Sequence, residues 1–405
     1  MPMILTTLCS LALGCALPRA EPAAVGMDRE RLATIDRVVE RGVAARGFPG
    51  AAVLVGRRGV AVWEAGYGRT AWDSRSPRVR PESTVYDLAS LTKVVATTTA
   101  AMILYDRGRL KLDAPVSRYL PAFRGGARSR VTVRQLLQHR AGLPAGRGLS
   151  RTRHTPAQAR RLLLSTALQY EPGTRTQYSD AGFELLGLVV EAAARQPLDV
   201  FVQRRVFRPL GMTSTTYRPS KALRARSAPT EIRGRSDVPL RGVVHDGEAA
   251  ALGGVAGHAG LFSTATDLGV FAQMMANGGV YKGVRIASDS AVALFTSPGP
   301  GWRALGWETC AGGGSCGHLM GARAFGHTGF TGTSLWIDPE RGTFVIVLAN
   351  WAHTDRDHPY PAPNAVLADV RADVADIATL SVTDAADGQP PMRERLRSDL
   401  AIGWW

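Results

Sequence analysis

The stretch Asp87-Leu-Ala-Ser90-Leu-Thr-Lys93, together with the apolar run 94–105 that follows it, decides the fold of this chain. Ser90 and Lys93 are three residues apart, so a helix that begins here places their side chains on one face. The residues after Ser90 are almost all apolar or small, which is typical of a helix buried on every side. The stretch therefore predicts a core helix that holds a serine beside a lysine on its first turn.

A buried lysine beside a serine can turn the hydroxyl into a nucleophile. Burial removes water from the amine, which lowers its pKa and lets it accept a proton. The first turn of a helix also directs backbone N–H groups at Ser90, where a substrate oxygen would become negative. The chain has four lysines and 45 arginines, and arginine cannot act as a base because it keeps its proton. The use of Lys93 at this position favours a catalytic pair over a capped core helix, although the spacing alone is a weak signal.

Length and composition set the limits for the rest of the interpretation. The chain has 405 residues, 45% of them hydrophobic, and a formal net charge of +15. This length permits one large domain or two to three smaller ones. The arginines are spread along the chain and no nucleic-acid motif accompanies them, so we expect no nucleic-acid partner. The charge is compatible with an anionic cell-wall polymer or a membrane surface as partner, but we favour a compositional bias toward arginine as its explanation.

Residues 3–17 form an apolar run that is too short to cross a bilayer but suits a signal peptide. Gly14-Cys15-Ala16 supplies small residues at the cleavage positions, and Cys15 is also a candidate for lipid attachment, although no positive stretch precedes the run. We expect residues 1–24 to be a signal peptide or lipoprotein leader. The protein would then be exported: periplasmic, secreted, or anchored to a membrane if Cys15 is lipidated. It would be cytoplasmic if the true start lies downstream.

Cysteine and histidine spacing gives no sign of a metal site. Cys9 and Cys15 lie in the apolar run, while Cys310 and Cys316 flank a Gly-rich loop, where a disulfide and two free thiols are equally compatible with the sequence. The eight histidines show no pairing typical of metal ligands. We therefore expect no metal and no cofactor.

Strand patterns lie near both ends of the chain, and helix patterns fill the middle. A hairpin is expected from strands 51–55 and 60–65, and late strands are expected at 333–337 and 343–349. Helices are expected at 28–44, 90–108, 133–139, from 155, 180–195, 198–207, 265–276 and 364–377. This order predicts an α+β fold in which a helical region is inserted into a sheet region. The domain would cover residues 25–380, followed by a poorly ordered tail at 381–405.

Two further stretches complete a set of motifs. Tyr178-Ser179-Asp180 precedes a helix, and His327-Thr328-Gly329 is expected at the entrance to a strand. With Ser90-Leu-Thr-Lys93, they resemble in order and spacing the S-x-x-K, Y-x-N and K-T-G motifs of the serine β-lactamase and penicillin-binding protein superfamily. Further stretches that carry the resemblance are 136–143, 244–246, 253–264 and 326–333.

The resemblance covers about residues 25–380 and is nearest to class C β-lactamases, small D,D-peptidases and family VIII-type esterases. It implies a β-lactamase/D,D-peptidase-like fold, with an antiparallel sheet from both chain ends flanked by helices. It implies that Ser90 is the nucleophile, that Lys93 and Tyr178 move its proton, and that the N–H groups of Ser90 and Phe330 bind the oxyanion. The implied substrate-binding residues are Asp180, His327, Thr328, Gly329 and Phe330.

The implied function is a serine hydrolase that works through an acyl-enzyme on a small-molecule or peptide substrate. D-Ala-D-Ala-type peptides or related small amides are the leading substrates, as in penicillin-binding D,D-carboxypeptidases. A carboxylesterase or a β-lactamase of the same fold is the alternative enzyme. A non-catalytic penicillin-binding or cell-wall sensor module is the alternative from another class of protein.

The chain departs from the superfamily pattern at two positions. Asp180 replaces the usual asparagine, so that a carboxylate stands in place of an amide; it is also a candidate helix cap. His327 replaces the lysine that faces the substrate carboxylate, and a histidine near its ordinary pKa of about 6.5 is mostly neutral at pH 7. This argues against strong β-lactam hydrolysis. We expect protonation of His327 near this pH to improve the binding of carboxylate-bearing substrates.

A few other residues are weaker candidates. Gly313-Gly-Ser315-Cys-Gly317 matches the G-x-S-x-G elbow of α/β-hydrolases, but no helix pattern follows it, which argues against Ser315 as a nucleophile. His245, Asp246 and His258 either line the site or form loop hydrogen bonds. Asn350 either reaches the substrate or is a turn residue.

Overall fold

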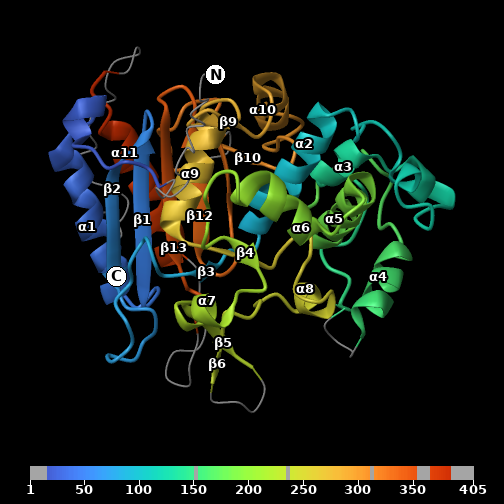
Figure 1. Ribbon diagram of the computed structural model, residues 1–405, viewed down its shortest axis with the longest axis horizontal. Coiled ribbons are helices and arrows are strands. Elements are labelled where there is room, and N and C mark those ends of the chain that lie inside the picture. The colour runs from blue at the N-terminus through green and yellow to red at the C-terminus, as the bar shows by residue number, and fades with distance from the viewer. Residues whose placement is uncertain (1–15, 150–153, 234–237, 311–313, 354–364, 385–405) are drawn as a thin grey trace, which may run out of the picture.

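The centre of the fold is a six-stranded antiparallel sheet in the order β10-β11-β12-β13-β1-β2 (Figure 1). The computed structural model describes residues 16–149, 154–233, 238–310, 314–353 and 365–384. The N-terminal hairpin joins the late strands because β1 pairs with β13, with Val53 opposite Val347. These pairings confirm the α+β class and the sheet built from both chain ends. The strands of this sheet are β1 (Gly50–Arg57), β2 (Val60–Gly68), β10 (Glu308–Thr309), β11 (Phe325–Thr328), β12 (Thr333–Asp338) and β13 (Thr343–Ala349).

Helices cover both faces of this sheet, so all eight residues of β1 are buried. Helices α1 (Arg29–Ala44) and α11 (Ala365–Leu380) pack together on one face, against β2 and β13. Helix α9 (Ala265–Ala276) packs on the other face and separates the sheet from the helical region in Figure 1. Alternate residues of β1 accordingly point to different cores: Val53 faces α1 and α11, and Leu54 faces α9.

The helical region is inserted between β2 and β10, as the sequence predicts. Its helices are α2 (Thr99–Asp106), α3 (Val133–Leu137), α4 (Pro156–Leu164), α5 (Asp180–Ala194), α6 (Leu198–Val202), α7 (Lys221–Ala225), α8 (Gly247–Ala251) and α10 (Asp289–Thr296), with π-helical turns at 93–98 and 203–207. Its strands are β3 (Tyr86–Asp87), β4 (Thr216–Tyr217), β5 (Pro229–Ile232), β6 (Pro239–Arg241), β7 (Leu261–Ser263), β8 (Val280–Tyr281) and β9 (Val284–Arg285).

Several helix starts lie where the capping pattern predicts them. Thr132 and Thr155 each form a capping box with a glutamine three residues later, at the starts of α3 and α4. Thr264 caps α9 by accepting the N–H of Asp267. Because these caps are local in sequence, the pattern alone is enough to locate them.

The described fold extends past both ends of the predicted 25–380 range. At the start, Leu17 is buried and the N–H of Ala61 donates to Pro18 at 2.9 Å. At the end, Val382 is buried and Asp384 lies 2.6 Å from the guanidinium of Arg57. Residues 16–24 and 381–384 therefore pack on the domain, while the rest of the predicted leader, with Cys9 and Cys15, and of the predicted tail lie outside the described residues.

Candidate active site

Ser90 lies on a tight turn between strand β3 and a buried helix. Ala89, just before it, has a φ of 45°, a strained conformation for a residue with a Cβ atom. Asp87 stabilises this turn because its Oδ1 accepts the N–H of Ala89 at 2.9 Å. Strand β3 also pairs with β7, so a small sheet supports the turn. These contacts place the Ser90 hydroxyl at the start of the helix.

The helix that follows is buried on every side, as its composition predicts. Its residues 93–98 form a π-helical segment before α2, a local widening that is frequent at functional sites. The hydroxyl of Thr97 donates to the carbonyl of Gly257 at 2.7 Å, which ties this segment to the Gly-rich loop 253–260. Lys93 begins the segment and is fully buried.

The three predicted catalytic side chains converge on one hydroxyl. Nζ of Lys93 lies 3.0 Å from Oγ of Ser90, and the hydroxyl of Tyr178 lies 2.8 Å from the same oxygen. Nζ of Lys93 is also 4.8 Å from the centre of the Tyr178 ring. The arrangement gives Ser90 two polar neighbours through which its proton can leave.

Tyr178 is held in place by the loop before α5. The N–H of Ser179 donates to Nδ1 of His139 at 3.0 Å, and the His139 ring lies 4.6 Å from the Tyr178 ring. Nδ1 accepts this bond only when it carries no proton. Burial, followed by the nearby cations Arg303 and Lys93, lowers the pKa of His139 well below its usual value, so the ring stays neutral.

Asp180 pairs with Lys93 and does not cap the helix. Its Oδ1 lies 2.6 Å from Nζ of Lys93, whereas the hydroxyl of Ser179 caps α5 by accepting the N–H of Gly182. Burial alone would lower the pKa of Lys93, but the Asp180 carboxylate and then the Tyr178 phenol outweigh it and raise that pKa above its ordinary value of 10.5. Lys93 is therefore an ammonium at neutral pH, which corrects the expectation that burial lowers its pKa.

We predict that Asp180→Asn lowers the pKa of Lys93, because the carboxylate that raises it is removed while burial remains. The measurement is an NMR pH titration of protein labelled at the lysine Cε carbons, in which the chain's four lysines give few signals. Because the folded-state pKa is raised, the ion pair stabilises the fold below the unfolded-state pKa of about 10.4 and ceases to do so above the folded-state value. The variant should thus be less stable at neutral pH. An unchanged Lys93 midpoint would show that Asp180 does not hold the charge.

The third motif ends one strand and leads into the next. His327 and Thr328 are the last residues of β11, so the expectation that they lie at a strand entrance is wrong. Gly329 follows in a tight connection to β12. A Cβ atom on Gly329 would lie 2.4 Å from the carbonyl oxygen of Leu88, so only glycine fits this close to the nucleophile turn.

The connection 329–333 is bonded directly to the nucleophile turn. The hydroxyl of Thr331 donates to the carbonyl of Asp87 at 2.6 Å, and that of Thr333 donates to Leu88 at 3.0 Å. These contacts bring Phe330 and Ser90 to one cavity, as the predicted oxyanion hole requires.

His327 is too buried to act as the expected pH-sensitive cation. Only 1% of it is exposed, and its Nδ1 donates to the carbonyl of Thr328 at 2.6 Å. Burial lowers the pKa of His327 to about 4, and the positive charges of Arg303 and Lys93 act in the same direction against the opposing effect of Glu308. The ring is therefore neutral at pH 6.5, which corrects the expected gain in carboxylate binding near that pH.

The site opens into a cavity of about 420 Å³. The residues that line it are Ala89, Ser90, Tyr178, Asp180, Arg233, His245, Asp246, Gly247, Ala259, Glu308, His327, Thr328 and Phe330. Phe330 is 54% exposed, and its ring stacks on that of His245 at 5.4 Å. His245 and Asp246 thus lie in the cavity wall, and the cavity combines an apolar surface with several carboxylates.

His258 lies behind the cavity wall and joins three parts of the site. Its Nε2 is 2.8 Å from Oδ1 of Asp246, its Nδ1 is 3.5 Å from Glu184, and its carbonyl accepts a bond from Lys93 at 3.2 Å. Burial lowers the pKa of His258, but the carboxylates of Asp246 and Glu184 outweigh it and raise the pKa to about 9. Burial raises the pKa of Glu184 to about 8. His258 therefore positions Lys93 and Asp246 rather than contacting the cavity.

Sequence reasoning missed several residues around the site. Arg371 of α11 donates to the carbonyls of Gly329 and Thr333 at 3.2 and 2.9 Å, and no local motif marks it. The missed residues are His139, Glu184, Arg303, Glu308 and Arg371. Glu184 carried a usable signal, because it is an acidic residue one turn after Asp180 and the only charged residue between positions 181 and 190.

The weaker candidates lie outside the catalytic group. Cys310 and Cys316 form a disulfide, and Ser315 lies in a turn beside it with no helix after it, which argues against a nucleophile elbow. Asn350 is buried, and its amide donates to the carbonyls of Thr70 and Pro229, so its role is structural.

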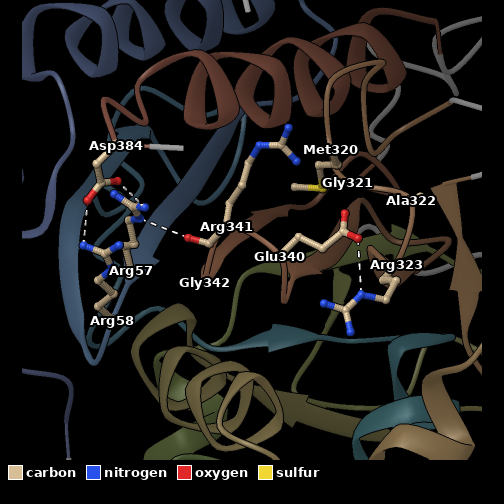
Figure 2. Close-up of a pocket in the computed structure, with 10 residues that line it drawn as sticks. All are labelled: Arg57, Arg58, Met320, Gly321, Ala322, Arg323, Glu340, Arg341, Gly342 and Asp384. Carbon is tan, nitrogen blue, oxygen red and sulfur yellow. Dashed lines mark hydrogen bonds and ion pairs between the residues drawn. The ribbon is translucent and has the colours of Figure 1, made fainter. Parts of the chain in front are cut away.

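Figure 2 shows a larger cavity, of about 780 Å³. The strand registers place it at the opposite end of the sheet from the 329–333 connection. Asp384 bridges Arg57 and Arg58 there, and Glu340 pairs with Arg323. None of the described residues that line it is a serine, cysteine, tyrosine or histidine. The smaller cavity beside Ser90 is therefore the candidate active site. Over the described ranges, no group of three His, Cys, Asp or Glu is placed to hold a metal ion.

A serine that shares hydrogen bonds with a lysine and a tyrosine beside an antiparallel sheet defines a serine hydrolase of the β-lactamase and D,D-peptidase fold. The beta-lactamase family model matches residues 35–370, and the chain belongs to this family. It is 34% identical to an N-acetylmuramyl-L-alanine amidase of Bacillus subtilis, over 83% of this chain and 84% of that protein. It is 31% identical to an Escherichia coli protein named "Putative D-alanyl-D-alanine carboxypeptidase", over 87% of this chain and 92% of that protein.

Solved structures share the fold at lower sequence identity. A penicillin-binding protein homologue from Caulobacter crescentus has a TM-score of 0.70 at 21% identity, covering 87% of this chain and 99% of that one. The hydrolase EstCE1 has a TM-score of 0.67 at 24% identity, covering 85% of this chain and 98% of that one. In the described part of the chain, no helix has the length and apolar character needed to cross a membrane.

Proposed function

We propose that this chain is an exported serine amidase that hydrolyses D-Ala-D-Ala-type peptides or related small amides through an acyl-enzyme on Ser90. The observation that carries the proposal is the convergence of Tyr178 and Lys93 on Oγ of Ser90, at 2.8 and 3.0 Å, beside a cavity of about 420 Å³. An amide is a demanding substrate because its leaving nitrogen must be protonated as the bond breaks. Two proton-carrying groups next to the nucleophile meet this need.

In the proposed mechanism, Oγ of Ser90 attacks the substrate carbonyl carbon. As Lys93 passes its proton to Asp180 across their 2.6 Å contact, it receives the proton of Ser90, so the pair gains one positive charge, which balances the negative charge that forms on the substrate oxygen. The Tyr178 hydroxyl then donates a proton to the leaving nitrogen as the C–N bond breaks, and Lys93 replaces that proton. Asp180 returns its proton to Lys93, which restores the starting charges.

The developing oxyanion would be bound by the backbone N–H groups of Ser90 and Phe330. Thr331 and Thr333 hold the segment that carries Phe330 against the nucleophile turn, so these donors are positioned before substrate arrives. Water would attack the ester of Ser90 in the second half-reaction, with the proton transfers reversed.

Two features support amides over the other substrates of this fold. Two of the most similar relatives are named an amidase and a carboxypeptidase, and both names refer to amide bonds. The neutral His327 does not supply the cation that the superfamily's third motif offers to a substrate carboxylate, which argues against β-lactams and, among amides, favours those without a free carboxylate there. A carboxylesterase is the second candidate, because exposed Phe330 gives the cavity an apolar wall.

The site of action is part of the same proposal. The apolar run 3–17 supports export, and the net charge of +15 supports contact with an anionic cell-wall polymer. Cell-wall amides would then be available to the enzyme in the compartment where it acts.

The proposal is tested with a substrate panel on purified protein: a D-Ala-D-Ala peptide as free acid and as amide, p-nitrophenyl butyrate, and nitrocefin. We expect hydrolysis of the amide bond in at least one form of the peptide. For nitrocefin we expect a kcat/KM at least about tenfold lower than for that peptide, because no third-motif cation contacts the nitrocefin carboxylate. Ester turnover without hydrolysis of either peptide would support the carboxylesterase instead.

A further inference from the structure

Two hydrogen-bond acceptors face each other in the cavity wall. Nε2 of His327 lies 3.7 Å from Oε1 of Glu308, and both residues line the cavity. The carbonyl of Thr328 can only accept a bond, so Nδ1 of His327 carries the proton of the neutral ring. Nε2 therefore carries a lone pair that is buried in the cavity wall, and no donor among the described residues satisfies it.

Burial and the nearby charges keep the His327 ring neutral, so that its Nε2 remains a hydrogen-bond acceptor. Burial is the main cause of its low pKa of about 4, and the cations Arg303 and Lys93 add to it against the opposing carboxylate of Glu308. Arg303 lies 3.3 Å from Oε1 of Glu308 but is 97% buried and is not among the residues that line the cavity. A ligand in the cavity thus meets the Glu308 carboxylate first, with the buried lone pair of His327 beside it and the cation of Arg303 behind them.

We propose that Glu308 and Nε2 of His327 form a binding site for an N–H group of the substrate, either an amide or an ammonium. Two acceptors 3.7 Å apart are close enough for one donor group to contact both at ordinary hydrogen-bond lengths. An unsatisfied buried acceptor is costly, so a ligand that supplies the missing donor gains from this pair.

The inference rests on the proposed function and narrows its substrate class. In the superfamily that the chain resembles, this motif faces the substrate's carboxylate. Here a carboxylate would meet another carboxylate and a lone pair, both of which repel it. Leaving groups that carry an amide or an amine in that position are therefore preferred over those with a free carboxylate.

The experiment uses three substrates that share an N-acetyl-D-alanyl group and differ in the leaving group. D-Alanine supplies a carboxylate, D-alaninamide supplies neutral N–H donors, and 1,2-diaminopropane supplies an ammonium. For the wild type, we expect kcat/KM for the D-alaninamide and diaminopropane substrates to exceed that for the D-alanine substrate by about 10- to 100-fold. Glu308→Gln should reduce the advantage of the ammonium over the carboxylate by about tenfold or more.

Two further variants make the result specific. Glu340→Gln removes a carboxylate from the larger cavity at the other end of the sheet and should leave the three rates and their order unchanged. His327→Lys replaces the lone pair by a cation and should shift the preference toward the carboxylate. Thermal melting shows which variants are folded before rates are compared.

Some outcomes would overturn the inference. A wild type that prefers the free carboxylate, or a preference ratio that Glu308→Gln leaves unchanged, shows that the pair does not bind an N–H group. If wild-type Ser90 forms no covalent adduct with any serine-directed probe or substrate, the proposed function fails and this inference with it. Normal labelling of Ser90 with no preference among the leaving groups removes this inference alone.

Discussion

Replacement of Ser90 by alanine should abolish turnover of every substrate and prevent labelling by a β-lactam or fluorophosphonate probe. In the proposed mechanism the Ser90 hydroxyl bonds to the substrate carbonyl, and among the described residues no other hydroxyl contacts both Lys93 and Tyr178. We expect a loss of at least about 10⁴-fold in kcat, comparable to removal of a serine nucleophile elsewhere. The measurements are steady-state kinetics and mass spectrometry of the labelled protein.

The matched control is Ser315→Ala, which removes the serine of the chain's other nucleophile-like motif. Ser315 lies in a turn beside the Cys310–Cys316 disulfide, so we expect turnover and labelling close to those of the wild type. The reverse pattern, with labelling lost in the Ser315 variant and kept in Ser90→Ala, would move the active site to that turn.

Lys93→Arg should be nearly as inactive as Lys93→Ala, with a loss of about 10²- to 10⁴-fold in kcat/KM. Arginine retains the positive charge beside Asp180 but cannot release a proton, so it cannot receive the proton of Ser90. If Lys93 acted only through its charge, arginine would replace it with a small loss. Comparison of Lys93→Arg with Lys93→Ala therefore distinguishes a role of Lys93 in proton transfer from a purely electrostatic role.

The control for Lys93→Arg is Lys221→Arg in α7, which makes the same chemical change on an exposed helix. It should leave kcat/KM and thermal stability close to those of the wild type. Because a guanidinium is larger than the ammonium that it replaces in a fully buried position, Lys93→Met serves as a further inactive variant with a similar side-chain volume. Retention of most activity in folded Lys93→Arg would show that Lys93 does not transfer the proton.

Local sequence patterns were enough to predict much of the fold. Capping boxes and apolar periodicity located α1, α3, α4, α9 and the buried helix after Ser90, because each depends on residues within a few positions of one another. Strands at both ends of the chain predicted the sheet. The pairing of β1 with β13 depends on contacts between distant segments, so it followed from the resemblance and not from local pattern.

The proposed catalytic group could likewise be predicted from three short motifs. Ser90, Lys93 and Tyr178 converge as the resemblance implies. The protonation states could not be predicted, because a pKa depends on burial and on charges brought in by other elements. Asp180 makes Lys93 an ammonium, whereas burial between β10 and β12 keeps His327 neutral.

The sequence by itself thus determined which residues are proposed to carry the chemistry and which class of fold holds them. Only the tertiary structure decided what surrounds them. Glu308, on the neighbouring strand, faces His327, and Arg371 of the last helix binds the segment beside Ser90. Such contacts join residues that no short-range periodicity relates, so their effects on charge and substrate choice arise when the sheet assembles.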